Sequence, residues 1–300
     1  DLTGGFGVDS YYFSKQFKTV IHCEVNAKLA EIAIHNFTIL QADNVTTKCT
    51  DGIEFLKTLK DKFDWIYIDP SRRDTQKNKK ILIEDCSPNI STIQELVFDH
   101  CENVLIKMSP MLDISSTLQI LKNVSNVYIV AIKNEVKELL FHQEKEFQSE
   151  VTINTSNTYS GGTEHFSFKI SQEKSAEATL NTPKRYLYEP NAAVMKSGGF
   201  KLVSEHYKLD KLDINTHLYT SDDLIKDFPG KTYKINSTHP YHKKTLKRLI
   251  GGQKANLKTR NFPEKIEAIK KYFKISDGGD NYLFFTCSLK SKIAIQCQLA

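Results

Sequence analysis

The sequence predicts an α/β protein with a parallel sheet at its front and two small α+β units behind it. Up to about residue 133, short apolar strands alternate with amphipathic helices, which is the pattern of βαβ units. After residue 150 the alternation breaks into two strand-like runs around a Ser-Gly-Gly turn. The last 70 residues are strongly basic. At 300 residues the chain is long enough for two or three domains.

The expected elements follow from periodicity and capping residues. Asn26 is placed to cap a helix whose apolar residues recur at helical spacing. Strands are expected at residues 19–23, 45–49, 65–68, 104–106 and 127–130, and helices at 26–36, 52–59, 90–101 and 114–121. Residues 151–153 and 166–170 are expected to form an antiparallel pair at the sheet edge. The parallel strands should be joined by right-handed crossovers.

The glycine-rich turn at residues 1–7 has no strand before it, although such a turn normally follows a buried strand. We therefore expect the first strand of the sheet to lie upstream of residue 1. A chain lacking that central strand should be poorly stable, and a sharp cooperative melt of residues 1–300 would contradict this expectation.

Charge and composition divide the chain into three expected domains, at residues 1–175, 184–228 and 229–300. A polar segment at 172–182 is typical of a linker, and a Phe-Pro-Gly at 228–230 separates the two smaller units. Residues 231–300 carry 15 Lys and Arg against 4 Asp and Glu, a net charge of +11, whereas the whole chain is only +5. A basic module of this kind is typical of a nucleic-acid handle, and a merely solubilising surface is the alternative.

Several protein classes are excluded by composition. No apolar run approaches the roughly 18 residues of a membrane span, and no signal peptide opens the chain. The six cysteines lie far apart without a CxxC pair, which favours reduced thiols in a cytoplasmic protein. His239 and His242 lack further ligands at metal-binding spacing, so no metal site is expected.

Acidic and glycine residues follow four of the expected strands, where a parallel sheet binds its ligand. Glycines allow a tight turn and a close approach to a ligand, and an acid directly after a strand, as Glu24 is after residues 19–23, can accept both ribose hydroxyls of a nucleoside. Each signal alone is weak, because a turn can be only a turn and an acid only a helix cap. The four groups are Asp1 with Gly5-Phe6-Gly7, then Glu24, then Asp51-Gly52, and last Asp69-Pro70.

In this order the elements resemble the class I S-adenosylmethionine-dependent methyltransferases. Residues 1–9 (DLTGGFGVD) read like their first motif, and residues 68–73 (IDPSRR) like their fourth. More narrowly, the chain resembles a bacterial methyltransferase group with a ferredoxin-like and a C-terminal THUMP-like domain. The further stretches that carry this resemblance are residues 107–113 (KMSPMLD), 188–193 (YEPNAA), 216–219 (THLY), 259–263 (TRNFP) and 277–283 (DGGDNYL).

The resemblance implies a Rossmann-like seven-stranded methyltransferase sheet, S-adenosylmethionine as cofactor and RNA as partner. The implied cofactor residues are Asp1, Thr3, Gly4, Gly5, Gly7, Glu24, Asp51, Gly52 and Asp69. The implied catalytic residues are Asp69, which orients the nucleophile, Pro70, which stiffens the loop, and Arg72. Substrate would be bound by Arg72, Arg73, Lys107, Ser109, Lys247, Arg248, Lys258 and Arg260.

One departure concerns the fourth motif. Ser71 stands in place of the second proline and Arg72 in place of the aromatic residue that stacks on a target base. A guanidinium can stack on a base or bind a phosphate, so nucleic acid stays compatible with the motif.

Three other functions stay open at this stage. An NAD-dependent dehydrogenase fits the glycine turn and Glu24, but Asp51 and Asp69-Pro70 at the later strand ends disfavour it, because a pyrophosphate site gains nothing from them. A non-catalytic RNA-binding protein on the same fold is compatible with the altered fourth motif, and a small-molecule methyltransferase would make the basic tail incidental.

Overall fold

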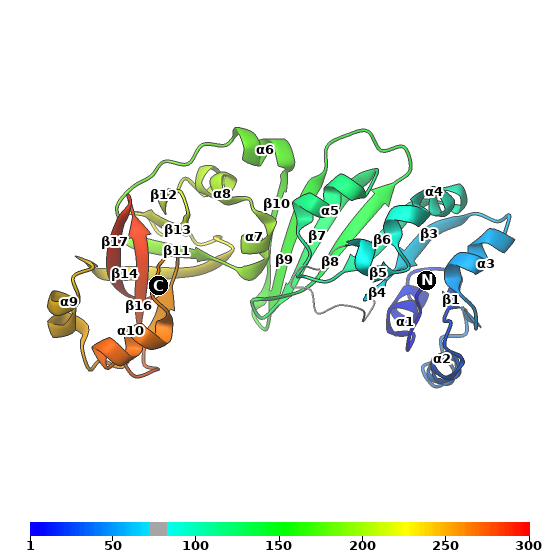
Figure 1. Cartoon of the computed structure of the whole chain (residues 1–300), viewed down its shortest axis with the longest axis horizontal. Helices are drawn as coiled ribbons and strands as arrows, with labels where there is room; N and C mark the ends of the chain where they lie inside the picture. The colour runs from blue at the N-terminus through cyan, green and yellow to red at the C-terminus, as the bar shows by residue number, and fades with distance from the viewer. Residues whose placement is uncertain (73–82) are drawn as a thin grey trace. The chain divides into compact units, whose positions relative to one another are not determined.

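The computed structural model describes residues 1–72 and 83–300 (Figure 1). The chain divides into two compact units, one of residues 1–130 with 136–154 and one of residues 131–135 with 155–300. Arg73 lies outside the described residues. Within the described ranges, no helix is long and apolar enough to cross a membrane.

The first unit is α/β, as the alternating pattern predicts. Its helices are α1 (Val8–Ser14), α2 (Ala27–Ile39), α3 (Gly52–Thr58), α4 (Ile90–His100) and α5 (Ile114–Ile120), with a short 3-10 turn at Ile83–Asp85. Its strands are β1 (Val20–Cys23), β2 (Val45–Lys48), β3 (Phe63–Ile68), β4 (Ser71–Arg72), β5 (Cys86–Ser87), β6 (Cys101–Met108), β7 (Val124–Ile132) and β8 (Glu135–Glu144), of which β7 and β8 meet at the division between the units.

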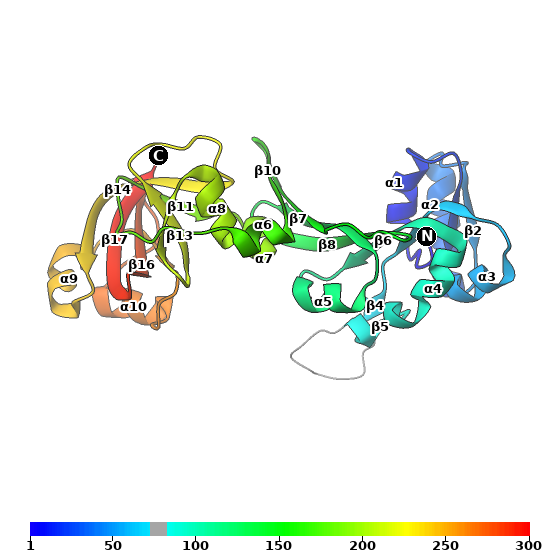
Figure 2. The same cartoon turned by 90° about the horizontal axis from the view of Figure 1, so that it is seen from above.

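Two parallel pairs of strands in the first unit position the candidate functional site. Strand β1 pairs with β2 in parallel, and β3 pairs with β6 in parallel. On its other side β6 pairs antiparallel with β8, and β7 follows in the same sheet. Helices α4 and α5 lie on one face of these strands (Figure 2). In the described residues β1 and β3 belong to separate sheets, so the seven-stranded Rossmann-like arrangement stays a prediction.

The helices of the first unit begin where polar side chains cap them. Asn26 accepts hydrogen bonds from the backbone N–H groups of Lys28 and Leu29, which starts α2 as the sequence predicts. The buried face of α2 is formed by Ala30, Ala33 and Phe37. This capping fixes the residues just before α2, among them Glu24, in a defined turn after β1.

A mainly apolar cavity of about 310 Å³ separates β1 from β3. Its lining includes Phe13 from α1, Phe17 just after that helix, Phe55 from α3 and Trp65 from β3. The first residues of the chain connect the two strands at one end of the cavity. The Asp1 amino nitrogen donates to Ile21 O at 2.9 Å, and Leu2 N donates to Tyr67 O at 3.0 Å.

The second unit is built on one seven-stranded sheet in the order β12-β13-β11-β14-β17-β16-β15. The strands of this sheet are β11 (Tyr186–Pro190), β12 (Asp210–Asp213), β13 (Thr216–Ser221), β14 (Gly230–Pro240), β15 (Asn256–Thr259), β16 (Asn281–Ser288) and β17 (Ser291–Leu299). Strands β9 (Thr152–Tyr159) and β10 (Gly162–Lys169) precede them in the chain and lie outside this sheet. Its helices are α6 (Ile170–Ser175), α7 (Ala192–Ser197), α8 (Phe200–Tyr207), α9 (Lys243–Ile250) and α10 (Ile266–Phe273). Because β11 pairs antiparallel with β14, the two expected small domains share this sheet.

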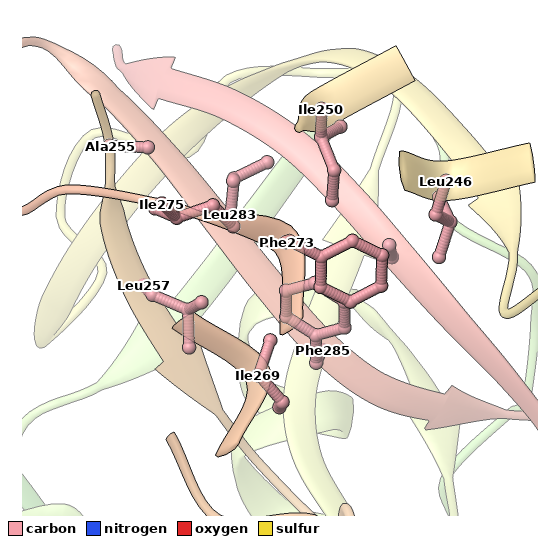
Figure 3. Packing of buried hydrophobic residues seen from close by; sticks show 10 residues of the cluster. Leu246, Ile250, Ala255, Leu257, Ile269, Phe273, Ile275, Leu283 and Phe285 are labelled. Atoms are coloured by element: carbon pink, nitrogen blue, oxygen red, sulfur yellow. The ribbon is translucent and has the colours of Figure 1, made fainter. Parts of the chain in front are cut away.

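Helices α9 and α10 pack on the sheet through a cluster of buried apolar side chains (Figure 3). Leu246 and Ile250 come from α9, and Phe273 stacks on Phe285 of β16 with ring centroids 5.8 Å apart. Helical spacing predicts that both Leu246 and Leu249 point inward, and for Leu249 this prediction is wrong. Leu249 is 46% exposed, because Leu246 and Ile250, four residues apart, form the buried stripe of this short helix.

Candidate functional site

The glycine-rich turn joins the ends of β1 and β3 in the first unit. Gly4 N donates to Cys23 O at 2.8 Å, and Thr3 N donates to the Asp1 carboxylate at 3.0 Å. Gly5 and Gly7 have φ values of 55° and 81°, in the left-handed region that favours glycine. A Cβ on Gly5 would meet nothing within 4 Å, so this part of the turn faces open space.

A buried network of polar side chains packs against the glycine-rich turn. Ser10 Oγ donates to Asp1 Oδ2 at 2.7 Å and lies 3.0 Å from His22 Nδ1. Burial lowers the pKa of His22 to about 4, so the ring is neutral at pH 7. A Cβ on Gly4 would lie 2.0 Å from this ring, which is why glycine is required there. Ser10 and His22 were not predicted, because neither belongs to a recognisable spacing of polar residues.

Glu24 follows β1 and faces the turn. Its Oε2 accepts from Gly5 N at 2.8 Å and its Oε1 from Asn26 N at 2.7 Å. The residue is 9% exposed. The carboxylate is therefore held beside the open side of the glycine turn, at the strand end where an acid can accept ribose hydroxyls.

Asp51 caps α3, which is the alternative role that the sequence left open. Its Oδ1 accepts from Ile53 N at 2.8 Å and Glu54 N at 3.1 Å. The adjacent Gly52 packs against the start of the chain, because a Cβ there would lie 2.4 Å from Leu2 O. The first turn of α3 is thus fixed next to the glycine-rich segment.

Asp69 follows β3 and is tied directly to the turn. Its backbone N donates to Thr3 Oγ1 at 2.7 Å, which brings the first and fourth motif segments together. Its Oδ2 lies 2.8 Å from Lys107 Nζ at the end of β6. The side chain is 40% exposed.

Lys107 joins Asp69 to a second carboxylate. Its Nζ donates to Asp9 Oδ2 at 2.6 Å, and Tyr67 Oη donates to the same oxygen at 2.8 Å. Burial works to lower the pKa of Lys107, but the hydrogen bonds to Asp69 and Asp9 outweigh it and raise that pKa. Burial and the bond to Asp9 raise the pKa of Tyr67. Lys107 and Tyr67 therefore stay protonated at neutral pH.

A cavity of about 320 Å³ opens beside Asp69 and Lys107. Pro70, Ser109 and Glu138 also line it. Burial raises the pKa of Glu138. Glu138 was not predicted as a site residue because strand β8 was not predicted, although Leu139 and Phe141 alternate with more exposed neighbours there as a strand requires.

Arg72 is described only through its backbone, which pairs with Cys86. The residues that the structure brings together in the first unit are thus Asp1, Thr3, Gly4, Gly5, Gly7, Glu24, Asp51, Gly52, Asp69, Pro70, Lys107 and Ser109. Among the described residues, no group of three or more His, Cys, Asp or Glu side chains is arranged to hold a metal ion.

The four basic residues expected to bind substrate in the second unit fall into two pairs. Lys247 and Arg248 are exposed on α9, and Lys247 Nζ lies 5.2 Å from the Tyr272 ring centroid. Lys258 and Arg260 instead bind the buried carboxylate of Glu189, with Arg260 Nη2 2.6 Å from Oε1 and Lys258 Nζ on Oε2. Tyr233 Oη donates to Oε2 at 3.1 Å. Glu189 belongs to the YEPNAA stretch, to which the sequence assigned no chemistry.

Comparison with known protein families identifies two domains in the second unit. Family models match the second unit as a ferredoxin-like domain at residues 186–229 and a THUMP domain-like region at residues 230–299. The chain is similar over its whole length to the crystal structure of a "putative methyltransferase from Porphyromonas gingivalis W83", with 31% identity and a TM-score of 0.91. It covers 76% of that protein. A comparison with curated proteins gave no match.

The chain therefore belongs to the methyltransferase family with a ferredoxin-like and a THUMP-like domain, which confirms the resemblance drawn from the sequence. Other similar structures cover about half of the chain. They include a "putative rRNA-methylase from Clostridium thermocellum", at 14% identity, 48% of this chain, 86% of that one and a TM-score of 0.36. A "putative methyltransferase from Streptococcus mutans in complex with SAH" has 13% identity, 48% and 85% coverage and a TM-score of 0.36.

Proposed function

We propose that the protein is an S-adenosylmethionine-dependent methyltransferase that acts on RNA. The observation that carries the proposal is the bond from Asp69 N to Thr3 Oγ1, because it joins the glycine turn, where a cofactor would bind, to the loop where transfer would occur. Membership of a methyltransferase family supports the same conclusion.

The residues around the turn fit this cofactor. Gly5 faces open space, and the Glu24 carboxylate lies against its N–H. Glu24 would accept the ribose hydroxyls, and Asp51 would meet the adenine amino group from the start of α3. When bound, the cofactor supplies a methyl group activated by a positively charged sulfur. A net negative rim of Glu24, Asp51 and Asp69 is electrostatically suited to such a cation.

The protein's part in the transfer is mainly one of position. Asp69 would accept a hydrogen bond from the N–H or O–H of the nucleophile, which turns its lone pair toward the methyl carbon. Pro70 restricts the backbone after Asp69, and Ser109 lines the same cavity. Orientation of two reactants can lower a barrier by roughly 7–11 kcal/mol in favourable cases, so no strong base is required.

The second unit supports RNA as the substrate class. Its last 70 residues carry a net charge of +11, and a THUMP-like region coincides with them. Lys247 and Arg248 present exposed charges on α9, whereas Lys258 and Arg260 are both engaged by the Glu189 carboxylate, which offsets one of their two charges. We therefore assign phosphate contact to Lys247 and Arg248 first.

Cofactor binding is tested by calorimetric titration of the full chain with S-adenosylmethionine, with NAD as the control ligand. The proposal expects binding of the first alone, and at least a tenfold loss of affinity in Glu24→Ala. Binding of NAD alone would support a dehydrogenase, and binding of neither would leave a non-catalytic RNA-binding protein.

RNA binding is tested by fluorescence anisotropy with a labelled single-stranded RNA oligonucleotide at increasing salt. Each phosphate contact contributes about −0.7 to the slope of log K against log salt, so the Lys247→Gln/Arg248→Gln variant should lose about 1.4 of the slope. The control is Lys15→Gln/Lys57→Gln, which removes two exposed charges from the first unit. A salt-independent affinity would favour a small-molecule substrate.

A further inference from the structure

Lys107 occupies a position that the proposed cofactor and substrate contacts do not explain. It comes from the end of β6, yet its ammonium bridges a carboxylate on α1 and one that follows β3. The Nζ atom lies 2.6 Å from Asp9 Oδ2 and 2.8 Å from Asp69 Oδ2. The ammonium is thus already engaged and is poorly suited to bind an additional phosphate.

The bridge has two geometric consequences. It fixes Asp69 through Oδ2, so that Oδ1 is the oxygen available to accept from a nucleophile. It also ties the transfer loop to α1, the helix that follows the glycine turn, because Asp9 lies in the first turn of α1. Tyr67 Oη donates to the same Asp9 oxygen, which fixes the far end of the bridge.

The bridge also sets the charge of this centre. Asp9 and Asp69 bring two negative charges and Lys107 one positive charge, and Glu138 lines the same cavity. Without Lys107, two carboxylates would stand unneutralised beside the place where the positively charged sulfur would bind. A partly buried centre with that excess of negative charge would bind a sulfonium far more tightly than a neutral sulfur.

That difference matters for the reaction. The nucleophile's lone pair forms the new bond to the methyl carbon, the C–S bonding pair stays on sulfur, and the nucleophile's proton goes to water. The sulfonium thereby becomes a neutral thioether. Interactions that stabilise only the charged ground state do not accelerate this step, because they are lost as the charge leaves sulfur.

We propose that Lys107 is a positioning residue of the transfer centre, which holds Asp69 through Oδ2 and offsets one of the two negative charges of Asp9 and Asp69, so that the centre prefers the sulfonium cofactor over its neutral thioether product less strongly than it would without the lysine. This assignment rests on the proposed function. It extends that function to a residue that acts through Asp69.

The test compares S-adenosylmethionine and S-adenosylhomocysteine by calorimetric titration of the full chain. In Lys107→Met the ratio of the two dissociation constants should shift by about tenfold in favour of the sulfonium, equivalent to about 1.4 kcal/mol. Lys107→Arg keeps the charge and should stay within about threefold of the wild-type ratio. The matched control is Lys15→Met, which removes an exposed lysine just after α1.

The ratio separates this role from a purely structural one. A structural lysine would weaken both ligands equally in Lys107→Met, and an unchanged ratio would overturn the assignment while leaving the proposed function intact. Lys107→Gln provides a second neutral variant should Lys107→Met fail to fold. If the wild-type protein binds neither ligand, the proposed function fails and the assignment fails with it.

Discussion

Replacing Glu189 by Gln should destabilise the second unit without weakening RNA binding. The Glu189 side chain is 7% exposed and binds both Lys258 and Arg260, and Tyr233 donates to it as well. The substitution keeps the shape of the side chain but removes its charge, so two cations lose their counter-ion. Burial already lowers the pKa of Lys258, even with Glu189 present.

The size of the effect follows from the exposure of the partners. Removing one member of a fully buried ion pair costs about 3–5 kcal/mol. The Lys258 side chain is 24% exposed and that of Arg260 is 43% exposed, so Arg260 can recover solvation by turning outward. We therefore expect a loss of about 2–3 kcal/mol in the free energy of unfolding of the second unit.

Urea unfolding measures this loss with two probes. Trp65 is the single tryptophan of the chain and lies in β3, so its fluorescence reports the first unit, while far-UV circular dichroism reports both. Asp277→Asn is the matched control, because its pair with Lys270 has the Asp side chain 70% exposed and should contribute under about 1 kcal/mol. If Glu189→Gln lost no more stability than this control, the buried cluster would not stabilise the second unit and our assignment would be wrong. If the variant bound RNA more tightly, Lys258 and Arg260 would be phosphate ligands, which would also contradict the assignment.

Three further outcomes are expected in the first unit. Gly4→Ala should destabilise this unit by about 1–3 kcal/mol and abolish detectable binding of S-adenosylmethionine, because the new Cβ would lie 2.0 Å from the His22 ring. Urea unfolding measures the stability and calorimetry the binding, and unchanged binding would contradict this packing. Because the pKa of His22 is about 4 when folded and 6.5 normally, the unfolded chain binds more protons between these values, so stability should fall by up to about 3 kcal/mol as pH drops from 6.5 to 4. His22→Asn should remove that part of the pH dependence from the Trp65 transition, whereas His217→Asn, whose histidine has a similarly lowered pKa in the second unit, should leave the Trp65 transition unchanged. Asp69→Asn should abolish methyl transfer to unmodified bacterial RNA, followed with radiolabelled cofactor, while cofactor affinity stays within about tenfold; full turnover would refute the role of Asp69.

Much of the first unit was predictable because its signals are local. The cap at Asn26 and the helical spacing after it predict α2 and so position Glu24. The four acidic and glycine groups were predictable as neighbours, since the carboxyl ends of parallel strands meet at one edge. The links that bring them together were not predictable, because the bond from Asp69 N to Thr3 Oγ1 joins residues 66 positions apart.

The remaining features depend on tertiary contacts that carry no sequence period. Lys107 was expected to bind substrate, and only the structure reveals Asp9 as its partner. Glu138 was not predicted because β8 was not predicted, since charged residues in this strand obscure its alternation of apolar and polar side chains. Glu189 shows the same limit in the second unit, because its partners Lys258 and Arg260 lie some 70 positions away. A carboxylate beside a tyrosine in a strand gives no indication of such a cluster.

The measurement that tests the central claim most directly is calorimetric titration of the wild-type chain with S-adenosylmethionine, beside Glu24→Ala. We predict a one-to-one complex that the variant weakens at least tenfold, because Glu24, which accepts from Gly5 N, would hold the cofactor's ribose beside the glycine turn. If the wild-type protein bound RNA but showed no binding of S-adenosylmethionine, the assignment as a methyltransferase would be contradicted. The protein would then use this fold to bind RNA alone.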